Sequence, residues 1–449
     1  MEYFKDDFNW DFKAKKSFRV IIVGAGIAGL AAGIGLKRAG HDVVILEQVP
    51  QIREVGAGIQ MAPNAARILG RFGLLEKIMK SANVMEKNSL RRWKNNEEIG
   101  TAPLMPKIGA KFKAPLSVIH RGDLQRILLE AVYAEKVDVR LKHKVIKAGP
   151  EFKASVQVQS GEWIEGDVVI AADGIKSDIR HQMASQHGVK DHSTCTGDAA
   201  YRVIIPREKM QGDKRALELL DSNVGMRWMG PGGHIMAYPI KNNNAYNMVL
   251  LHPQKPDAES TESWTNKGDK KEMLDFYKDW NDLVRDLLSF VPKGEINEWT
   301  LNSHRPLPHW IENECALIGD SCHPMLPYVA QGAAQGIEDA AVLTVSLSLA
   351  EDVPTALGVY EAVRKLRGEA IQNSAATTRQ ALHLPDGPEQ EKRDKAIAGT
   401  GPNPDLWADE DWQDFMWGVD VMKDTLEDWG KWVAQVQGHH LGSVKGVIY

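Results

Sequence analysis

A glycine-rich turn between two apolar runs constrains the fold of this chain more than any other feature. The run 20–23 leads into three glycines with the spacing G-x-G-x-x-G, and a second apolar run covers 43–46. The pattern predicts a strand, a helix and a second strand, in which Gly24 allows a tight turn, Gly26 lets a pyrophosphate approach the backbone, and Gly29 lets helix and strand pack closely. The helix N-terminus would face the phosphates. The sequence therefore predicts a Rossmann-like dinucleotide-binding unit.

Two further residues of this unit are candidates for contact with the bound nucleotide. Ala28 lies inside the glycine fingerprint, at the start of the predicted helix. Glu47 follows the second strand about twenty residues after the glycines, where an acid accepts hydrogen bonds from a ribose hydroxyl. Because an acid at this place disfavours a 2′-phosphate, we expect the adenosine of FAD or NAD rather than that of NADP.

Length, charge and cysteine content narrow the class of protein. With 449 residues, 43% of them apolar, the chain is long enough for two or three domains or one large composite. The net charge of −5 argues against nucleic acid as a partner. No apolar run approaches the roughly 20 residues that cross a bilayer, and residues 1–18 lack the apolar segment of a signal peptide. The three cysteines, Cys195, Cys315 and Cys322, indicate a reducing compartment, so we expect a cytoplasmic protein.

A second region has the pattern of an antiparallel sheet. Short apolar strands recur over 197–252 between turn signals, and 89–118 shows similar short pieces between prolines. A helix is expected over 272–291, after which the chain returns to a buried strand at 315–318. The expected fold class is therefore α/β, with a Rossmann-like domain interleaved with an antiparallel β-sheet substrate domain, plus C-terminal helices.

The expected domain boundaries follow from these patterns. The nucleotide-binding domain comprises 18–88, 119–196 and 306–384, and the substrate domain comprises 89–118 and 197–305. Residues 385–449 are expected to form a linker and a C-terminal helical tail, because 385–404 are polar and rich in Pro and Gly. Five tryptophans in the tail lie among apolar residues at roughly helical spacing, which predicts a helix packed against the body or against a second subunit.

A strand end late in the chain carries a motif that suits a flavin. The apolar run 315–318 leads into Asp320, and a helix is expected to begin near residue 331. Asp320 is placed to accept hydrogen bonds from the sugar-like chain of a flavin. Gly332 and Ala333 allow a planar ring to approach the helix N-terminus, whose dipole favours negative charge on the reduced ring.

In this order, the motifs resemble those of class A FAD-dependent aromatic monooxygenases, and the chain is similar to salicylate hydroxylases and related fungal phenol-modifying enzymes over roughly residues 18–380. The resemblance is carried by the fingerprint with Glu47, Asp173-Gly174 after an apolar strand, and Gly319-Asp320 with Pro327 and Gln331-Gly332, supported by Gly56–Gln60 and His120–Leu124. It implies that Arg121 contacts the cofactor, that Asp320 binds the ribityl chain, and that the backbone near Ala333 meets the flavin. Gly58 and Asp173 are further cofactor contacts implied by the matched motifs.

The resemblance also implies a reaction. NAD(P)H would reduce bound FAD, visiting transiently over residues 173–180, and dioxygen would react through a flavin C4a-hydroperoxide to hydroxylate a phenolic or related aromatic substrate. One alternative is a flavin-dependent epoxidase or dearomatising hydroxylase of a secondary metabolite. An alternative from another class is an NAD-linked dehydrogenase without oxygen chemistry.

Four residues are candidates for the substrate side of the site. The resemblance implies that Arg202 faces the substrate ring, where it would anchor a carboxylate or phenolate; the alternative is an outward surface arginine. His234 and Tyr238 lie four residues apart in a predicted strand and share one face. If that face is inward, His234 takes the phenol proton, or else it is a structural histidine, while Tyr238 has the pattern of a core residue. Gln331 either orients the substrate hydroxyl or caps the following helix.

The sequence gives no matched set of metal ligands. Cys322 and His323 lie next to Asp320, but no second ligand pair accompanies them, so no metal site is expected. We expect a monomer or homodimer. The identity of the aromatic substrate and the choice between NADH and NADPH stay open at this point.

Overall fold

The strand, helix and strand expected at the fingerprint are present. The computed structural model describes residues 4, 6, 8, 10, 13–52, 56–191, 193–254, 266–294 and 296–438. In it, β1 (Arg19–Val23) leads through the glycine turn into α1 (Ile27–Ala39), and β2 (Asp42–Leu46) runs parallel to β1. Both strands are buried apart from their first residues, because a covered parallel sheet leaves no solvated face.

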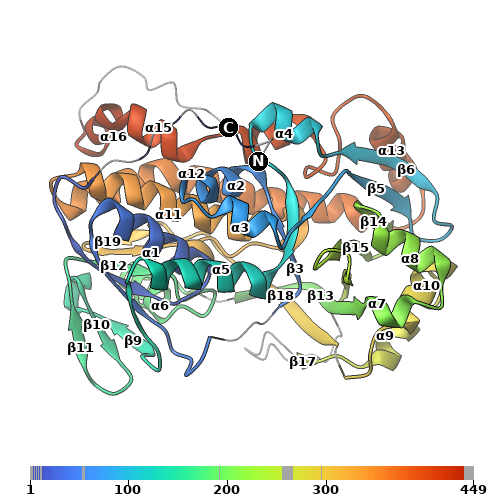
Figure 1. Cartoon of the computed structure of the whole chain (residues 1–449), viewed down its shortest axis with the longest axis horizontal. Helices are drawn as coiled ribbons and strands as arrows, with labels where there is room; N and C mark the ends of the chain where they lie inside the picture. The colour runs from blue at the N-terminus through green and yellow to red at the C-terminus, as the bar shows by residue number, and fades with distance from the viewer. Residues whose placement is uncertain are drawn as a thin grey trace.

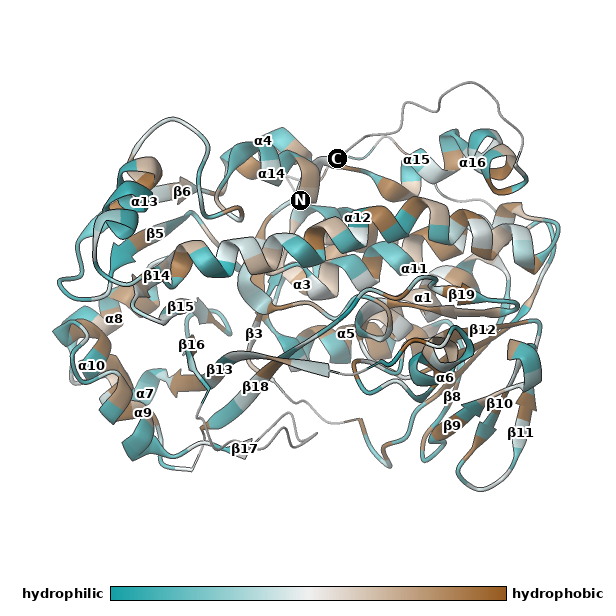
Figure 2. Ribbon diagram, turned by 180° about the vertical axis from the view of Figure 1, so that it is seen from behind, coloured by the Kyte–Doolittle hydropathy of each residue, from teal (hydrophilic) through white to brown (hydrophobic). Residues whose placement is uncertain are grey.

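These strands belong to a sheet built from separate stretches of the chain. Within the described residues, its order is β19 (Ile311–Glu312), β20 (Cys315–Leu317), β12 (Val168–Ala171), β1, β2 and β8 (Asp138–Arg140). Neighbouring strands are parallel except for β19 and β20. The carboxyl ends of β1, β12 and β20 therefore meet at one edge, where ligands bind in folds of this kind. The brown colour of β12 in Figure 2 reflects its wholly apolar sequence.

Helices cover one face of this sheet. α1 packs against α5 (Arg121–Ala134) and α11 (Gly332–Leu349), and α11 packs against α12 (Val353–Leu382). Figure 1 shows α11 and α12 above the strands, although the four helices come from widely separated parts of the chain. Below the sheet in Figures 1 and 2 lie the small strands β9 (Val145–Ala148), β10 (Ser155–Val158) and β11 (Trp163–Glu165), with α6 (Asp178–Gln186) packed on β9.

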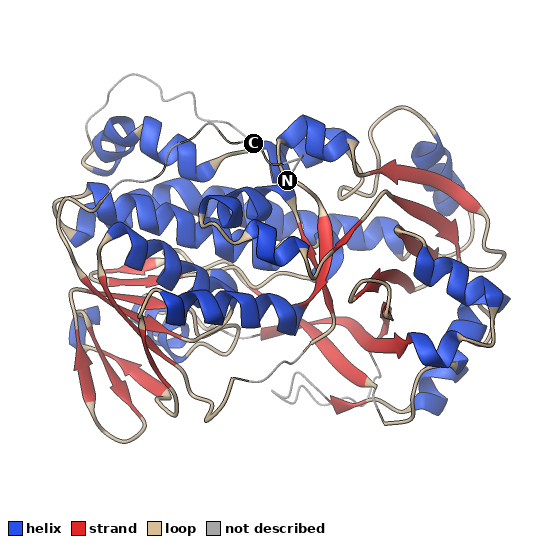
Figure 3. Ribbon diagram, viewed as in Figure 1, coloured by secondary structure: helices blue, strands red, loops and turns tan. Residues whose placement is uncertain are grey.

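A larger sheet, separate from the first, lies in the right half of Figure 3. Within the described residues, its order is β17 (Asn266–Lys267), β18 (Asn297–His304), β13 (Ser193–Pro206), β16 (Ala245–Pro253), β15 (Gly233–Ile240), β14 (Val224–Gly230), β5 (Lys87–Arg92) and β6 (Glu98–Pro103). The sheet is mainly antiparallel, as expected, but β5 runs parallel to β14. A small sheet lies beside it and consists of β3 (Gly58–Met61), β7 (Ser117–His120) and β4 (Asn83–Val84).

Short helices fill the connections. They are α2 (Pro63–Arg71), α3 (Leu75–Met79), α4 (Lys107–Phe112), α7 (Arg207–Met210), α8 (Lys214–Asp221), α9 (Lys270–Phe276) and α10 (Asp282–Ser289). The expectation of one helix over 272–291 is wrong, because two helices, α9 and α10, occupy this segment with a break between them. The Asn281 side chain accepts a hydrogen bond from the Val284 N–H at 3.1 Å and begins the second helix.

The expectation that the polar residues 385–404 form a linker is wrong over much of this stretch. α13 (Pro388–Ala398) occupies this stretch and packs on β6, where Ile397 is buried. Pro388 in the first turn, with Glu389 and Glu391 beside it, favours a helix start, and the polar composition obscured this signal. The tail then continues through α14 (Glu410–Gln413), a π-helical segment (Asp414–Gly418), α15 (Val421–Glu427) and α16 (Trp429–Val436). Trp407 and Trp417 are buried against the body.

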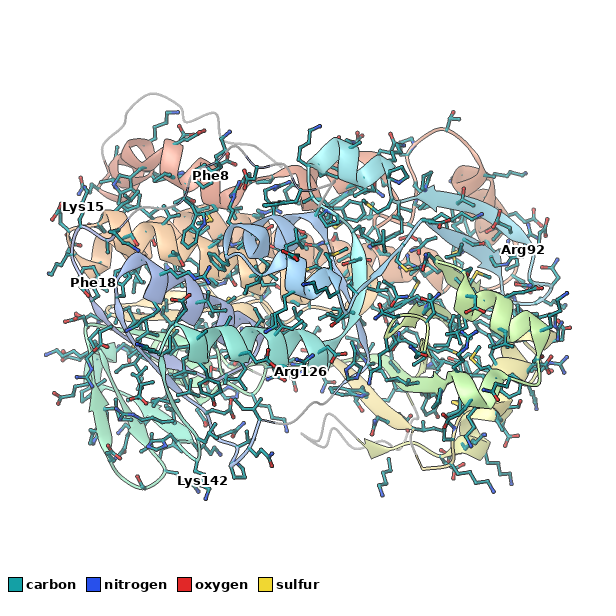
Figure 4. All side chains as sticks on the ribbon, in the orientation of Figure 1. Phe8, Lys15, Phe18, Arg92, Arg126 and Lys142 are labelled. Carbon is teal, nitrogen blue, oxygen red and sulfur yellow. The ribbon has the colours of Figure 1, made fainter. Side chains whose placement is uncertain are left out.

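Charged side chains are spread over the surface. The labelled Lys15, Arg92 and Lys142 lie at separate edges of the molecule in Figure 4. Arg126 forms ion pairs with two acids of its own helix, Asp123 at 3.3 Å and Glu130 at 3.0 Å. None of the helices described is long and apolar enough to span a membrane.

Candidate functional site

A cavity of about 370 Å³ lies where the glycine fingerprint, the segment 318–336 and the larger sheet meet. Many of the residues expected to contact the cofactor line it: Gly26, Ala28, Gly58, Arg121, Asp320, Gly332 and Ala333. The residues expected on the substrate side also line it: Arg202, His234, Tyr238 and Gln331. Gly24, Gly29, Glu47 and Asp173 are not part of its lining. The fold thus brings both groups of candidates to one cavity.

The glycine fingerprint has the geometry that its spacing predicts. Gly24 has φ +102°, and a Cβ on it would lie 2.5 Å from the carbonyl oxygen of Ala172. A Cβ on Gly29 would lie 2.1 Å from the carbonyl oxygen of Gly24. In contrast, a Cβ on Gly26 would meet nothing within 4 Å and would point into open space at the start of α1. Two glycines therefore serve close packing, and Gly26 opens the helix N-terminus toward a ligand.

Glu47 and Asp173 are not part of the cavity lining, although their neighbours in the fold are. Glu47 accepts hydrogen bonds from the backbone N–H groups of Ala25, at 2.8 Å, and Val49, at 3.0 Å, and so holds the glycine turn against the end of β2. Burial raises the pKa of Asp173 to about 6, and its Oδ1 has no hydrogen-bond partner within the described chain. Its neighbour Gly174 does line the cavity. Contacts of Glu47 and Asp173 with a cofactor stay predictions.

The segment after β20 forms the wall opposite the fingerprint. Gly319 has φ +62°, its N–H donates to Asp339 at 2.9 Å, and Asp320 follows it on the cavity lining. A Cβ on Gly336 would lie 2.9 Å from the Cβ of Ala28, so α11 touches α1 at the cavity. The glycine fingerprint and the segment 318–336, about 300 residues apart in the chain, thus line the same cavity. Their backbones are open to contact with a long ligand such as FAD. The residues present fit that cofactor.

A buried ionic network supports this wall from behind. Asp339 accepts hydrogen bonds from the His323 imidazole, at 2.6 Å, and from Arg364, at 2.8 Å. Cys322 lies close enough to form a three-ligand group with this pair. Because Arg364 places a positive charge on the same carboxylate, the arrangement is that of an ion pair, and the absence of a metal site stays a prediction.

One face of the larger sheet presents the substrate-side candidates. Four residues form a row of cross-strand partners across this sheet. In order, they are Arg202 on β13, Val249 on β16, Met236 on β15 and Arg227 on β14. His234 and Tyr238 flank Met236 at alternate positions of β15 and point to the same side. The structure agrees with the expectation that they share one face, and it places this face toward the cavity.

Arg202 brings an uncompensated charge to the cavity. Its guanidinium stacks over Trp299, with 5.3 Å between its carbon and the ring centroid, and has no ion pair within the described residues. Burial lowers its pKa, although an arginine stays charged. A half-buried cation without an acidic partner favours an anionic ligand group.

His234 and Gln331 are oriented by neighbouring side chains. Nδ1 of His234 lies 2.8 Å from Nε2 of His383. Burial lowers the pKa of His234 well below its ordinary value, and His383 and Arg227 lower it further, so the ring is neutral at neutral pH. Gln331 precedes α11 without capping it through its side chain; its Oε1 accepts from Asn64 and Gln335, both at 3.0 Å.

The sequence reasoning missed two residues of the site, together with the acid that one of them contacts. Arg227 and Trp407 line the cavity, and Arg227 both stacks over Trp407, at 5.4 Å, and donates a hydrogen bond to the buried Asp405. The available signal was a charged residue inside the apolar strand 226–229. Trp407 was assigned to packing of the tail, and only the folded chain shows that this tail reaches the cavity.

The stretch expected to bind the nicotinamide, 173–180, is held at its C-terminal end by hydrogen bonds of Arg180. Arg180 is buried and donates to Asp191 at 2.9 Å and to the carbonyl oxygens of Ser321, Cys322 and Arg305. Its guanidinium therefore links α6 to the wall after β20. Transient binding of NAD(P)H over 173–180 stays a prediction and cannot depend on this side chain.

Replacing Gly26 by valine tests the opening at the helix N-terminus. We expect the dissociation constant for FAD to rise at least about tenfold, equivalent to 1.4 kcal/mol, because the new side chain takes the place of the pyrophosphate. The melting temperature of the apoprotein should change little, since nothing in the protein is within 4 Å of a Cβ there. FAD fluorescence quenching measures the affinity. Gly430→Val is the control, because its Cβ is equally free but lies in α16 away from the cavity; equal loss in both variants would contradict the prediction.

Comparison with known proteins agrees with the geometry. Residues 17–375 match the FAD binding domain family. The chain is 37% identical over 394 residues to an FAD-dependent monooxygenase of Arthrinium sp, covering 86% of this chain and 91% of that protein. It is 31% identical to 3-hydroxybenzoate 6-hydroxylase 1 of Aquipseudomonas alcaligenes, covering 85% and 94%. A solved salicylate hydroxylase substrate complex superposes with a TM-score of 0.76 at 25% identity, covering 97% of this chain and 100% of that one. The chain therefore belongs to the FAD binding domain family and is a flavin-dependent monooxygenase.

Proposed function

We propose that this chain uses NAD(P)H and dioxygen to hydroxylate a phenolic or related aromatic compound that carries an acidic group. The observation that carries the proposal is the cavity itself, in which the cofactor candidates face a sheet wall bearing Arg202 and His234. Bound FAD supplies the electron transfer and the activation of dioxygen. The similarity to 3-hydroxybenzoate 6-hydroxylase 1 and to salicylate hydroxylase, two enzymes named for phenolic acids, supports this substrate class.

The protein contributes orientation, charge and a proton acceptor. Arg202 binds the acidic group of the substrate, because no acid of the described chain neutralises it. His234 is neutral and lies on β15 two residues before Met236. It accepts the proton of the phenol hydroxyl. Gln331 keeps its carbonyl oxygen occupied by two donors, so its amide N–H groups remain to hold a substrate oxygen. Val249 and Met236 provide an apolar floor that keeps water from the ring.

The organisation of the chain is part of the proposal. We assign 18–88, 119–196 and 306–384 to the FAD-binding domain and 89–118 and 197–305 to the substrate domain. The sheet orders support this division to within a few residues, since β5 and β13 of the larger sheet begin at Lys87 and Ser193. The helical tail beyond them adds Trp407 to the substrate cavity. The free cysteines, one exposed and two buried, are consistent with a cytoplasmic enzyme. A dehydrogenase without oxygen chemistry finds no support among the relatives, which are named monooxygenases.

The direct test is a screen of phenolic acids, polyketide aromatics and indoles with the FAD-loaded enzyme. A substrate is expected to stimulate NADH or NADPH oxidation and to form a product carrying one oxygen atom from labelled dioxygen. Stimulated oxidation with no labelled oxygen in any product would contradict hydroxylation. A labelled epoxide or dearomatised product would favour the secondary-metabolite alternative instead.

Replacing Arg202 by methionine tests the proposed anion contact. For a phenolic acid, KM should rise roughly 10- to 100-fold, because a hydrogen bond to a charged group contributes about 1.5–3 kcal/mol. Arg202→Lys should recover part of this loss, since it keeps the charge but not the planar donors. Steady-state kinetics on a phenolic acid and on the same phenol without its acidic group form the matched comparison. An equal rise in KM for both compounds would show that Arg202 does not bind the acidic group.

A further inference from the structure

A chain of polar side chains leads from the cavity through the protein behind His234. His383, at the end of α12, contacts His234 at 2.8 Å and is held by its own carbonyl oxygen, which accepts the Gly232 N–H at 3.1 Å. Nδ1 of His383 faces Oδ2 of Asp198 at 3.8 Å. His234 and Asp198 are 3% and 2% exposed, so these groups interact with little screening by water.

Asp198 is fixed by two further groups. Arg379 donates to both of its carboxylate oxygens, with 2.6 Å between Nη2 and Oδ1, and the hydroxyl of Tyr328 donates to Oδ2. The side chain of Arg379 is 34% exposed, so the chain of contacts ends at the surface. Asp198 lies on β13 four residues before Arg202 and is therefore held by the same strand as the proposed substrate anchor.

The contact between the two imidazoles requires one proton between them. Burial lowers the pKa of His383 to about 4, and the pKa of His234 is also low, so both rings are neutral. Either His234 donates through Nδ1, or His383 donates through Nε2. In the second case His383 would turn an unprotonated Nδ1 toward the Asp198 carboxylate, which is repulsive. The first case places the His383 Nδ1–H toward Asp198 and leaves Nε2 of His234 unprotonated.

We infer that Asp198 and His383 are positioning residues that hold His234 in the tautomer protonated on Nδ1, so that its Nε2 accepts the substrate proton. The inference rests on the proposed function for its use in catalysis. The step is balanced: the phenol O–H breaks, a proton binds Nε2, and the imidazolium faces the phenolate. His234 keeps its hydrogen bond to His383 throughout. Charged groups around the pair are Arg227 on the side of His234, and Arg379 with Asp198 on the side of His383.

The tautomer can be measured without any substrate. In nitrogen-15 spectra of histidine-labelled holoenzyme at pH 7, with signals assigned through His234→Gln and His383→Gln, the His234 ring should carry its proton on Nδ1. Asp198→Asn should shift it toward the form protonated on Nε2, because the new amide can donate to His383 Nδ1. Asp191→Asn is the matched control, since Asp191 also bonds an arginine and histidines, but those histidines are His181 and His304 rather than His234 or His383.

Two results would overturn the inference: a wild-type His234 protonated on Nε2, or an Asp198→Asn spectrum with the wild-type tautomer. With a phenolic substrate, Asp198→Asn should lower kcat at least about tenfold at pH 7 and recover at higher pH, where the phenol ionises unaided. A loss that is the same at every pH would indicate a merely structural role. If the tautomer is as expected but no phenol is hydroxylated, the proposed function fails and the tautomer assignment stands.

Discussion

Replacing Arg364 by methionine is expected to lower the free energy of unfolding by about 3–5 kcal/mol, because it removes the cation that two buried carboxylates share. Arg364 donates to Glu338 at 2.5 Å and to Asp339 at 2.8 Å, and all three side chains are fully buried. Burial alone would raise the pKa of Glu338, but Arg367 and Arg364 hold it below its ordinary value. Without Arg364, Glu338 retains Arg367 and Asp339 retains His323, but the buried network loses one positive charge.

The same variant should weaken FAD binding. Asp339 accepts the Gly319 N–H that sets the turn before Asp320, and Glu338 accepts from Asn64, which also holds Gln331. A network that loses its central cation therefore disturbs the cavity wall as well as the core. FAD retention through gel filtration measures this effect beside urea unfolding.

Arg215→Met is the matched control for Arg364→Met. Arg215 also bridges two acids, Asp282 at 2.9 Å and Asp286 at 2.6 Å, but its side chain is 51% exposed. Exposed pairs contribute about 0–1 kcal/mol, so the control should unfold at nearly the wild-type urea concentration. If both variants lost a similar free energy of unfolding, burial would not be the reason that the Arg364 ion pairs stabilise the fold.

The sequence alone predicted those parts of the site that depend on local pattern. The fingerprint glycines, the strand ending before Gly319 and the alternation of His234 with Tyr238 are fixed by neighbours a few residues away, and the structure agrees with them. Local pattern also misled where composition and helix-start signals disagreed, as at α13. The Pro388 signal was present, but the surrounding polar residues outweighed it.

Contacts between distant segments could not be predicted in this way. His383 meets His234 across 149 positions, and Asp405 meets Arg227 across 178. Nothing in the residues around His383 indicates that α12 ends beside the β14–β15 turn, because that placement follows from the packing of α11 on α1 and of α12 on α11. Partners of this kind emerge only from the assembled fold.

Replacing His234 by glutamine should lower kcat for a phenolic substrate by roughly 10²- to 10⁴-fold at pH 7, the range that a general base contributes. Glutamine keeps polarity and similar size but accepts no proton, so the loss should shrink as pH rises and the phenol ionises by itself. In the wild type, the rate should hold as pH falls through 6.5, because the lowered pKa keeps His234 in its basic form there. Its decline should begin only at lower pH, when the imidazole becomes protonated.

The control for this substitution is His41→Gln. His41 is also buried and neutral, since burial lowers its pKa to about 4. Its Nδ1 accepts the Phe18 N–H at 3.1 Å, and neither residue lines the cavity. The chemical change is the same, so His41→Gln reports the cost of losing a buried imidazole and should leave the pH profile of kcat as in the wild type. Rates at several pH values, measured by product formation rather than NAD(P)H oxidation, separate lost proton transfer from uncoupled oxidation. A His234→Gln enzyme whose rate deficit stays constant as the phenol ionises would show that His234 orients the substrate rather than accepting its proton.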